Sequence, residues 1–316
     1  MKILQVLDPA HEHWVQGGTF KDLRLNSEFF ETRPVYLGAP FRTQRFRTWI
    51  CSFLKTTKFD YILFSSITPL ENYYRFSRFF PRKQKMAVWF THQEGEFTPL
   101  QLSALDSCAV VFVHSLREKM NLELLISSNV EVTLGAIDSS RFSSPPKPGK
   151  CVVWIGTPNI RKNPEEFLRL ASENPSLSFR ILGKNWLGTH MANRILQLPN
   201  IEYSEIIGPL KSSDLDGCDI YICTSMIEGG PMPLLESIAG NLKVLSRDVG
   251  FVRDVFYTFG ISTKFIYSRY EEILPLIGQL RNSPVPNYSS KIHFYSFNRL
   301  SKLISESLFS TGEMRK

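Results

Sequence analysis

Short apolar segments alternate with longer helical stretches along the whole chain, and this rhythm restricts the fold more than any other feature. Strands that alternate with helices form parallel sheets that are covered on both faces. We predict strands at Lys2–Leu7, Pro34–Leu37, Tyr61–Ser65, Met86–Phe90, Val110–Val113, Cys151–Ile155, Ser178–Leu182, Ile220–Thr224 and Lys243–Ser246. The sequence therefore predicts an α/β fold with doubly wound parallel sheets.

The rhythm is interrupted once, at Ser143–Gly149, where three prolines and a glycine fall within seven residues. Neither a helix nor a strand can continue through such a segment, so it predicts a linker. A chain of 316 residues has room for two domains. We expect Rossmann-like domains at 1–144 and 145–290, followed by a terminal helical segment at 291–316.

Composition excludes several classes of protein. Hydrophobic residues make up 43% and charged residues 21%, which is typical of globular proteins and not of disordered ones. No apolar run reaches the roughly 18 residues of a membrane helix, and no secretory signal is recognisable. The five cysteines form no Cys-x-x-Cys pair, so we expect reduced thiols, no metal site and a cytoplasmic protein.

The net charge of +7 is concentrated in one stretch, residues 41–85. Only Asp60 and Glu71 oppose its ten basic residues, which are Arg42, Arg45, Arg47, Lys55, Lys58, Arg75, Arg78, Arg82, Lys83 and Lys85. A one-sided patch indicates an anionic partner. Aromatic residues between these cations suit an anionic membrane surface at the inner membrane face, and equally suit stacking and phosphate contacts on nucleic acid. A solvated basic face is the third interpretation.

Ligands of parallel α/β sheets bind beyond the carboxyl ends of the strands. The loop after the Ile220–Thr224 strand contains Glu228, Gly229, Gly230 and, in the helix that follows, Glu236. The glycines let the backbone approach a ligand closely, and the amides of a helix start suit a phosphate. Two carboxylates beside a phosphate site can accept hydrogen bonds from sugar hydroxyls. Taken alone, they could also be an exposed loop acid and a helix-face acid.

The order of several motifs resembles one family. These are Glu228-x7-Glu236, Gly156 to Asn163, Arg180 to Gly183, Gly208 to Leu210, Asp219 to Ser225, Gly17-Gly18, Asp106 to Ser115, and Gly135 to Asp138 with Phe142. Together they look like the motifs of retaining glycosyltransferases of family 4 (glycosyl transferases group 1). The resemblance implies the GT-B fold, in which two Rossmann-like domains face each other across a cleft. It places the acceptor at the first domain and the nucleotide-sugar donor at the second, and the terminal helix crosses back to the first.

The resemblance also implies roles for individual residues. Lys162 would hold the donor diphosphate, and Glu236 would accept hydrogen bonds from the ribose. Glu228 would contact the transferred sugar near its reacting carbon, with Gly229 and Gly230 at the donor phosphates. The family retains anomeric configuration, with the leaving phosphate helping to deprotonate the acceptor. No cofactor and no essential metal are expected.

Further site residues follow from the same resemblance. His92 falls where the family has a histidine beside the sugar, and Gly17 and Gly18 would bring first-domain backbone towards the phosphates or the acceptor. His92 could also be an ordinary loop histidine, and the glycines an ordinary turn. The family has an arginine where this chain has Thr157, and Arg161 is the candidate to supply that cation.

Two questions stay open at this stage. The acceptor is a glycan or lipid-linked molecule in polysaccharide or glycolipid synthesis, or else a nucleic acid, and a non-catalytic nucleotide-sugar-binding protein is the third alternative. Asp214-Leu215-Asp216 resembles the metal-binding motif of another glycosyltransferase fold. We interpret it instead as a helix start with Asp214 as the N-cap residue.

Overall fold

We describe the chain from a computed structural model, which describes residues 2–7, 31–36, 59–77, 84–90, 96–206 and 208–313. Its contacts divide the chain into two compact units. Unit 1 consists of Met1–Ala136 together with Phe297–Lys316, and unit 2 consists of Ile137–Ser296. The first division therefore falls earlier in the chain than the predicted boundary at 144/145.

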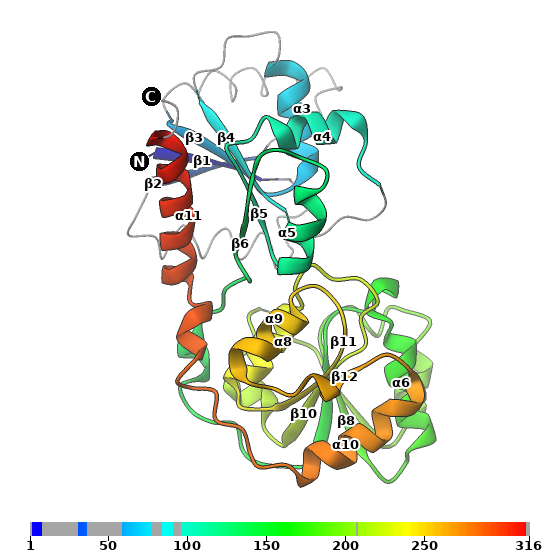
Figure 1. The fold of residues 1–316 in the computed structure, drawn as a ribbon. Coiled ribbons are helices and arrows are strands. Elements are labelled where there is room, and N and C mark those ends of the chain that lie inside the picture. The colour runs from blue at the N-terminus through cyan, green and yellow to red at the C-terminus, as the bar shows by residue number, and fades with distance from the viewer. Residues whose placement is uncertain are drawn as a thin grey trace. The chain divides into compact units, whose positions relative to one another are not determined.

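Unit 1 contains a six-stranded parallel sheet with the strand order β2-β1-β3-β4-β5-β6 (Figure 1). Its strands are β1 (Lys2–Leu7), β2 (Glu31–Tyr36), β3 (Tyr61–Phe64), β4 (Lys85–Trp89), β5 (Val110–Val113) and β6 (Asn129–Val132). Its helices are α3 (Ile67–Ser77), α4 (Pro99–Asp106), α5 (Leu116–Glu123) and α11 (Phe297–Glu313). Helix α4 begins with a complete capping box between Thr98 and Gln101, which satisfies two backbone N–H groups.

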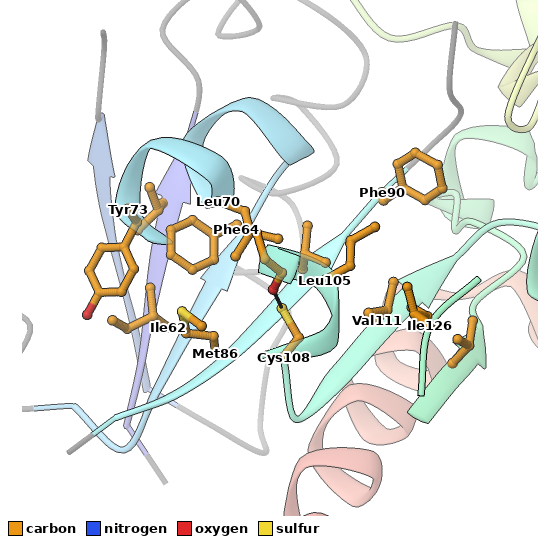
Figure 2. Close-up of a cluster of buried hydrophobic side chains, with 14 of the residues drawn as sticks. Ile62, Phe64, Leu70, Tyr73, Met86, Phe90, Leu105, Cys108, Val111 and Ile126 are labelled. Atoms are coloured by element: carbon orange, nitrogen blue, oxygen red, sulfur yellow. Dashed lines mark hydrogen bonds between the residues drawn. The ribbon is translucent and has the colours of Figure 1, made fainter. Parts of the chain in front are cut away.

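The central strands of unit 1 are buried on both faces, as expected for a parallel sheet. On one face Ile62 and Phe64 pack with Leu70 and Tyr73 of α3, and Figure 2 shows these side chains together with Leu105 of α4. The rings of Phe64 and Tyr73 lie 5.3 Å apart. Helices α3, α4 and α5 cover this face, whereas α11 lies along the other side of the sheet (Figure 1).

Helix α11 closes the second face of the unit 1 sheet. Its buried residues Phe297, Leu300, Ile304 and Leu308 share a core with strand residues such as Trp89. Each fully buried side chain of this size contributes about 1.5–3 kcal/mol, so the helix is a substantial part of the stability of unit 1.

A buried polar relay lies in the same unit. The Trp89 indole N–H donates to the Thr133 hydroxyl at 3.1 Å, and this hydroxyl donates to the Val113 carbonyl at 2.9 Å. The hydroxyl thus joins the ends of β4 and β5 through one buried side chain.

Unit 2 contains a second six-stranded parallel sheet, in the order β12-β11-β10-β7-β8-β9. Its strands are β7 (Cys151–Ile155), β8 (Ser178–Leu182), β9 (Ile201–Ser204), β10 (Cys218–Cys223), β11 (Lys243–Arg247) and β12 (Ile266–Tyr267). Its α-helices are α6 (Pro164–Glu173), α7 (Ala192–Gln197), α8 (Met232–Ala239), α9 (Val252–Phe259) and α10 (Ile273–Asn282). Its 3-10 helices are η3 (Ser139–Phe142), η4 (Ile160–Lys162), η5 (Ser212–Leu215), η6 (Thr263–Phe265), η7 (Tyr270–Glu272) and η8 (Ile292–Tyr295).

All nine predicted strands are confirmed, four of them (β1, β5, β7 and β8) with the predicted bounds and five with shifted ends, and the α/β prediction holds. The strands that we did not predict are β6, β9 and β12, and each of them is an edge strand of its sheet. The predicted start of the fourth edge strand, β2, was also late, at Pro34 instead of Glu31. Edge strands β6 and β9 are only partly buried, so they lack the continuous apolar run on which the predictions relied.

The predicted linker, Ser143–Gly149, has neither helix nor strand. It is nevertheless attached to unit 2. The Lys147 backbone N–H donates to the Asp216 carboxylate at 2.8 Å, and the Gly217 N–H donates to the Lys147 carbonyl at 2.8 Å. Within the described ranges, no helix is long and apolar enough to cross a membrane.

Candidate functional site in the second unit

The loop that leaves β7 carries Lys162 at the carboxyl edge of the unit 2 sheet. The Asn159 side chain caps η4 by accepting the Arg161 N–H at 2.9 Å. Asn163 follows in the left-handed conformation (φ 47°), which asparagine tolerates better than most residues, and Pro164 then begins α6. Two tight turns therefore fix the backbone on both sides of Lys162.

The loop that leaves β10 brings Glu228 to Lys162. The Lys162 Nζ lies 2.7 Å from the Glu228 Oε1, and the Ser225 hydroxyl donates to the same oxygen at 3.2 Å. The two charged side chains are only 23% and 15% exposed. A partly buried ion pair thus joins two residues that are 66 positions apart.

The Thr224 hydroxyl connects the same two loops beneath the ion pair. It accepts the Trp154 indole N–H at 2.9 Å and donates to the Lys162 carbonyl at 2.7 Å. Thr224 is fully buried. A second bond, from the Met226 N–H to the Arg161 carbonyl at 2.7 Å, lies alongside. Both bonds hold the backbone of Lys162 against the β10 loop.

The strand exits also approach each other closely at two glycines. A Cβ atom on Gly183 would lie 1.8 Å from the Gly156 carbonyl oxygen, so no larger residue fits there. The Trp186 indole N–H donates to the same carbonyl at 3.0 Å, and the Trp154 and Trp186 rings meet edge to face at 5.0 Å. The ends of β7 and β8 are therefore locked around buried tryptophans.

The glycines of the Glu228 loop have a packing role of their own. A Cβ atom on Gly230 would lie 2.0 Å from the Phe251 ring, and one on Gly250 would lie 2.2 Å from the Gly229 carbonyl oxygen. Phe251 is fully buried. Packing against the β11–α9 loop therefore requires glycine at position 230, independently of the ligand approach that we expected for it.

Glu236 lies on α8 with its side chain 15% exposed. The Arg141 Nη1 is 3.6 Å from its Oε1. Burial raises the pKa of the Glu236 carboxyl to about 7, because the charged form loses solvation; the Arg141 charge lowers this pKa, and the Asp214 charge raises it. Glu236 therefore titrates near neutral pH.

Asp214 is not the N-cap residue that we predicted. The N-cap residue of η5 is Lys211, and the Asp214 carboxylate accepts the Lys211 backbone N–H at 2.9 Å. Sequence reasoning missed this because a short 3-10 turn starting one turn earlier uses the acid at its third position. Among the described residues, no three His, Cys, Asp or Glu side chains form a group that could hold a metal ion.

The structure thus brings Lys162 and Glu228 into contact and places Glu236 in the same unit. Arg161 lies on η4 beside Lys162, and the Thr157 carbonyl accepts the Asn159 N–H at 2.8 Å in the same loop. Gly17, Gly18 and His92 lie outside the described residues.

Eight of the ten basic residues of the stretch also lie outside the described residues: Arg42, Arg45, Arg47, Lys55, Lys58, Arg78, Arg82 and Lys83. Arg75 pairs with Glu71 at 2.9 Å on α3. The Lys85 Nζ lies 5.9 Å from the centre of the Tyr61 ring. The two described cations therefore have local partners on unit 1.

Sequence reasoning missed Arg141, Thr224 and Ser225 as members of the site. Thr224 and Ser225 could have been found, because polar residues that follow a buried strand lie at the ligand-binding edge. Arg141 carried no such signal, since only folding brings it to Glu236.

The arrangement can bind an anion and hydroxyl groups together. Lys162 supplies a positive charge and contacts Glu228, which lies in the loop before α8, and the dipole at the start of α8 also favours negative charge. The Glu228 and Glu236 carboxylates supply hydrogen-bond acceptors. A phosphorylated sugar or nucleotide contains both kinds of group.

Comparison with known proteins agrees with this chemistry. Residues 137–280, most of unit 2, match the family model described as "Glycosyl transferases group 1". None of the curated protein sequences matches the chain.

Solved structures match over nearly the whole chain. Anabaena Alr3699/HepE in complex with UDP has a TM-score of 0.78 and 10% identity, over 98% of this chain and 100% of that one. The lipopolysaccharide outer core galactosyltransferase WaaB in its apo form has a TM-score of 0.75 and 11% identity, over 98% and 99%. Sucrose-phosphate synthase from Thermosynechococcus elongatus has a TM-score of 0.74 and 10% identity, over 98% and 100%.

At these identities the structural matches establish the fold. The chain accordingly has the GT-B fold of these glycosyltransferases, and its residues 137–280 match the group 1 glycosyl transferase family.

Proposed function

We propose that the protein is a retaining glycosyltransferase of family 4, which transfers a sugar from a nucleotide-sugar donor to an acceptor hydroxyl in the synthesis of a cell-surface polysaccharide or glycolipid. The observation that carries the proposal is the 2.7 Å ion pair between Lys162 and Glu228, in the unit that also holds the Glu236 carboxylate. Structures of HepE with UDP and with UDP-glucose support a nucleotide-sugar donor.

The geometry suits cleavage of a glycosyl phosphate bond. Lys162 would contact the donor diphosphate, and its charge would stabilise the negative charge that develops as the bond from the sugar carbon to the phosphate oxygen breaks. Glu228 holds the Lys162 ammonium in place and would accept a hydrogen bond from the transferred sugar. Glu236 would accept hydrogen bonds from the ribose.

The bond changes in this step are balanced without a separate base. The bonding electron pair leaves with the diphosphate, and the acceptor oxygen bonds to the sugar carbon on the same face. The acceptor proton passes to the departing phosphate oxygen. Configuration at the sugar carbon is therefore retained.

Donor binding is the first test. Thermal unfolding of the purified protein should be measured with a panel of nucleotide sugars and nucleoside diphosphates, without added metal. A ligand at 100 times its dissociation constant stabilises the native state by about 2.7 kcal/mol, which raises the midpoint measurably. A protein that responds to no member of the panel contradicts the proposal.

Variants test the assigned residues. Lys162→Ala and Glu228→Ala should each remove most of the sugar-transfer activity, because each breaks the ion pair beside the donor. Glu173→Ala is a matched control, since it breaks an exposed ion pair with Arg169 that has a similar 2.8 Å distance. Circular dichroism should show that all three variants fold. Full activity in Lys162→Ala or Glu228→Ala would remove the assignment.

The stereochemical outcome can be tested without a known acceptor. Slow hydrolysis of UDP-α-glucose should release the α-anomer of glucose first, which proton NMR resolves before mutarotation. Early release of the β-anomer contradicts a retaining mechanism. Donor binding without any sugar release, even with glycan acceptors present, would favour a non-catalytic nucleotide-sugar-binding protein.

The acceptor proposal rests on the charge of residues 41–85. We expect the protein to sediment with vesicles that contain an anionic phospholipid and to remain in solution with neutral vesicles. Salt-sensitive binding to DNA without vesicle binding would instead favour a nucleic-acid acceptor.

A further inference from the structure

Glu236 and Arg141 form a charged pair that neither the motif nor the family match assigns. The Nη1–Oε1 distance is 3.6 Å, and the side chains are 15% and 19% exposed. At this separation and burial the two charges interact much more strongly than an exposed pair would.

Arg141 is itself held in position by the start of unit 2. It lies on η3, which Asp138 caps by accepting the Ser140 N–H at 3.0 Å, while the following Phe142 is buried. The guanidinium donates to the Leu210 carbonyl at 3.1 Å and lies 3.8 Å from the Asp138 carboxylate. Contacts with the Leu210 carbonyl, the Asp138 carboxylate and the Glu236 carboxylate therefore determine the position of the guanidinium.

We propose that Arg141 is a positioning residue of the donor site: its guanidinium favours the ionised form of the Glu236 carboxylate and orients it so that both oxygens can accept hydrogen bonds from the ribose diol. This inference rests on the proposed function. An ionised carboxylate accepts hydrogen bonds at both oxygens, whereas a protonated carboxyl has one O–H group, which donates. The protonation of Glu236 thus decides how well a diol is bound.

Other titratable and charged groups lie on the elements around Glu236, and two of them shift its pKa. Elements that pack on α8, together with η5, carry Asp138, Arg141, Asp214, Asp219, Tyr221, Lys243, Arg247, His293, Tyr295 and the thiols of Cys218 and Cys223. Of these, Arg141 and Asp214 shift the pKa of Glu236, in opposite directions. Asp219 is paired with Arg281, and Arg247 is paired with Glu166.

The first experiment needs no ligand. The carboxyl ¹³C resonance of Glu236, assigned by its loss in Glu236→Gln, should titrate near pH 7 in the wild type. Arg141→Gln should raise this pKa by about 1–3, the usual effect of an opposite charge at this range. Asp214→Asn should lower it and strengthen UDP-glucose binding at pH 7, so that this variant still tests whether the ionisation of Glu236 sets donor affinity if Arg141→Gln fails to fold.

The second experiment measures UDP-glucose affinity by calorimetry between pH 6 and pH 8, where the diphosphate of this ligand does not titrate. With a pKa of about 7, the ionised fraction of Glu236 rises about tenfold over this range, and the wild-type affinity should rise with it. At pH 7, Arg141→Gln should bind about fivefold more weakly or worse. Adding Asp214→Asn to this variant should restore part of the affinity.

Arg281→Gln is the matched control. Arg281 pairs with Asp219 at 3.0 Å, the side chains are 21% and 18% exposed, and its guanidinium also donates to a backbone carbonyl, that of Lys150. The Arg281→Gln variant loses a similar ion pair of unit 2 and should change neither the pKa of Glu236 nor the affinity for UDP-glucose.

The outcomes separate this inference from the proposed function. An unchanged Glu236 pKa in Arg141→Gln overturns the inference, and so does a changed pKa with unchanged UDP-glucose affinity. Loss of affinity in Arg281→Gln as large as in Arg141→Gln also overturns it, because a general structural effect would then explain both. A wild-type protein that binds no nucleotide sugar contradicts the proposed function, and the inference falls with it.

Discussion

Replacing Thr224 by valine should have two effects: it should destabilise unit 2, and it should remove the hydrogen bond that holds the Lys162 backbone. Valine has the shape of threonine but cannot accept the Trp154 indole N–H or donate to the Lys162 carbonyl. An unsatisfied buried group costs about 1–3 kcal/mol, and the carbonyl, being only part-buried, adds less than the indole. We therefore expect a loss of about 2–4 kcal/mol in the free energy of unfolding of unit 2.

Two control variants separate the hydroxyl from the methyl group and the site from the fold. Thr224→Ser keeps the hydroxyl and should lose about 1 kcal/mol, the value of one buried methyl group. Thr133→Val breaks the matching relay of unit 1, from Trp89 through Thr133 to Val113. It should cost unit 1 a similar amount and leave donor affinity unchanged.

The assay is urea unfolding followed by the NMR signals of the Trp154 and Trp89 indoles, which report on unit 2 and unit 1 respectively. Nucleotide-sugar affinity is measured in parallel. The reasoning is refuted if Thr224→Val loses no more stability than Thr224→Ser. It is also refuted if Thr133→Val weakens nucleotide binding as much as Thr224→Val does.

Three further perturbations of unit 2 have expected outcomes. Gly183→Ala should lower the free energy of unfolding by about 3 kcal/mol, because its Cβ would lie 1.8 Å from the Gly156 carbonyl oxygen. Gly188→Ala, whose Cβ would have no atom within 4 Å, should change it by no more than about 0.5 kcal/mol in the same urea assay. Lys243→Met should lower the thermal midpoint by the equivalent of about 2–3 kcal/mol, because it removes three hydrogen bonds to carbonyls at the end of α10. The Glu236 pKa is raised from 4.5 to about 7, so between these pH values the native protein retains a proton that the unfolded chain releases. The free energy of unfolding, compared with that of Glu236→Gln, should therefore fall by up to about 3 kcal/mol as the pH rises from 4.5 to above 7. A flat difference across that pH range would contradict the assignment.

Interior and edge strands differed in how far they could be predicted. Strands such as β7, with four of its five residues buried, are continuous apolar runs because helices cover both faces of the sheet. The edge strand β9 is only partly buried and β12 has two residues, so only their pairing in the folded sheet defines them. The parallel direction of the strands could be predicted from their alternation with helices, but their order within each sheet could not.

In the site, too, residues that follow a strand could be predicted, whereas contacts between segments far apart in the sequence could not. Glu228 could be predicted because its loop follows a strand and the carboxyl ends of parallel strands share one edge, and Lys162 was assigned from the family resemblance. The contact of Arg141 with Glu236 could not, because η3 is irregular and its position depends on packing against α8. The requirement for glycine at position 230 likewise comes from a distant ring, that of Phe251.

The return of α11 to unit 1 has a consequence for synthesis on the ribosome. All residues of unit 2 have been made once Ser296 is added, whereas the sheet of unit 1 still lacks the helix that covers its second face. At about 5–20 residues per second, the stretch from Ile137 to Ser296 takes roughly 8–32 s to translate. Throughout this time the apolar side chains around Trp89 lack the helix that buries them in the folded protein, so the unit that is begun first is completed last.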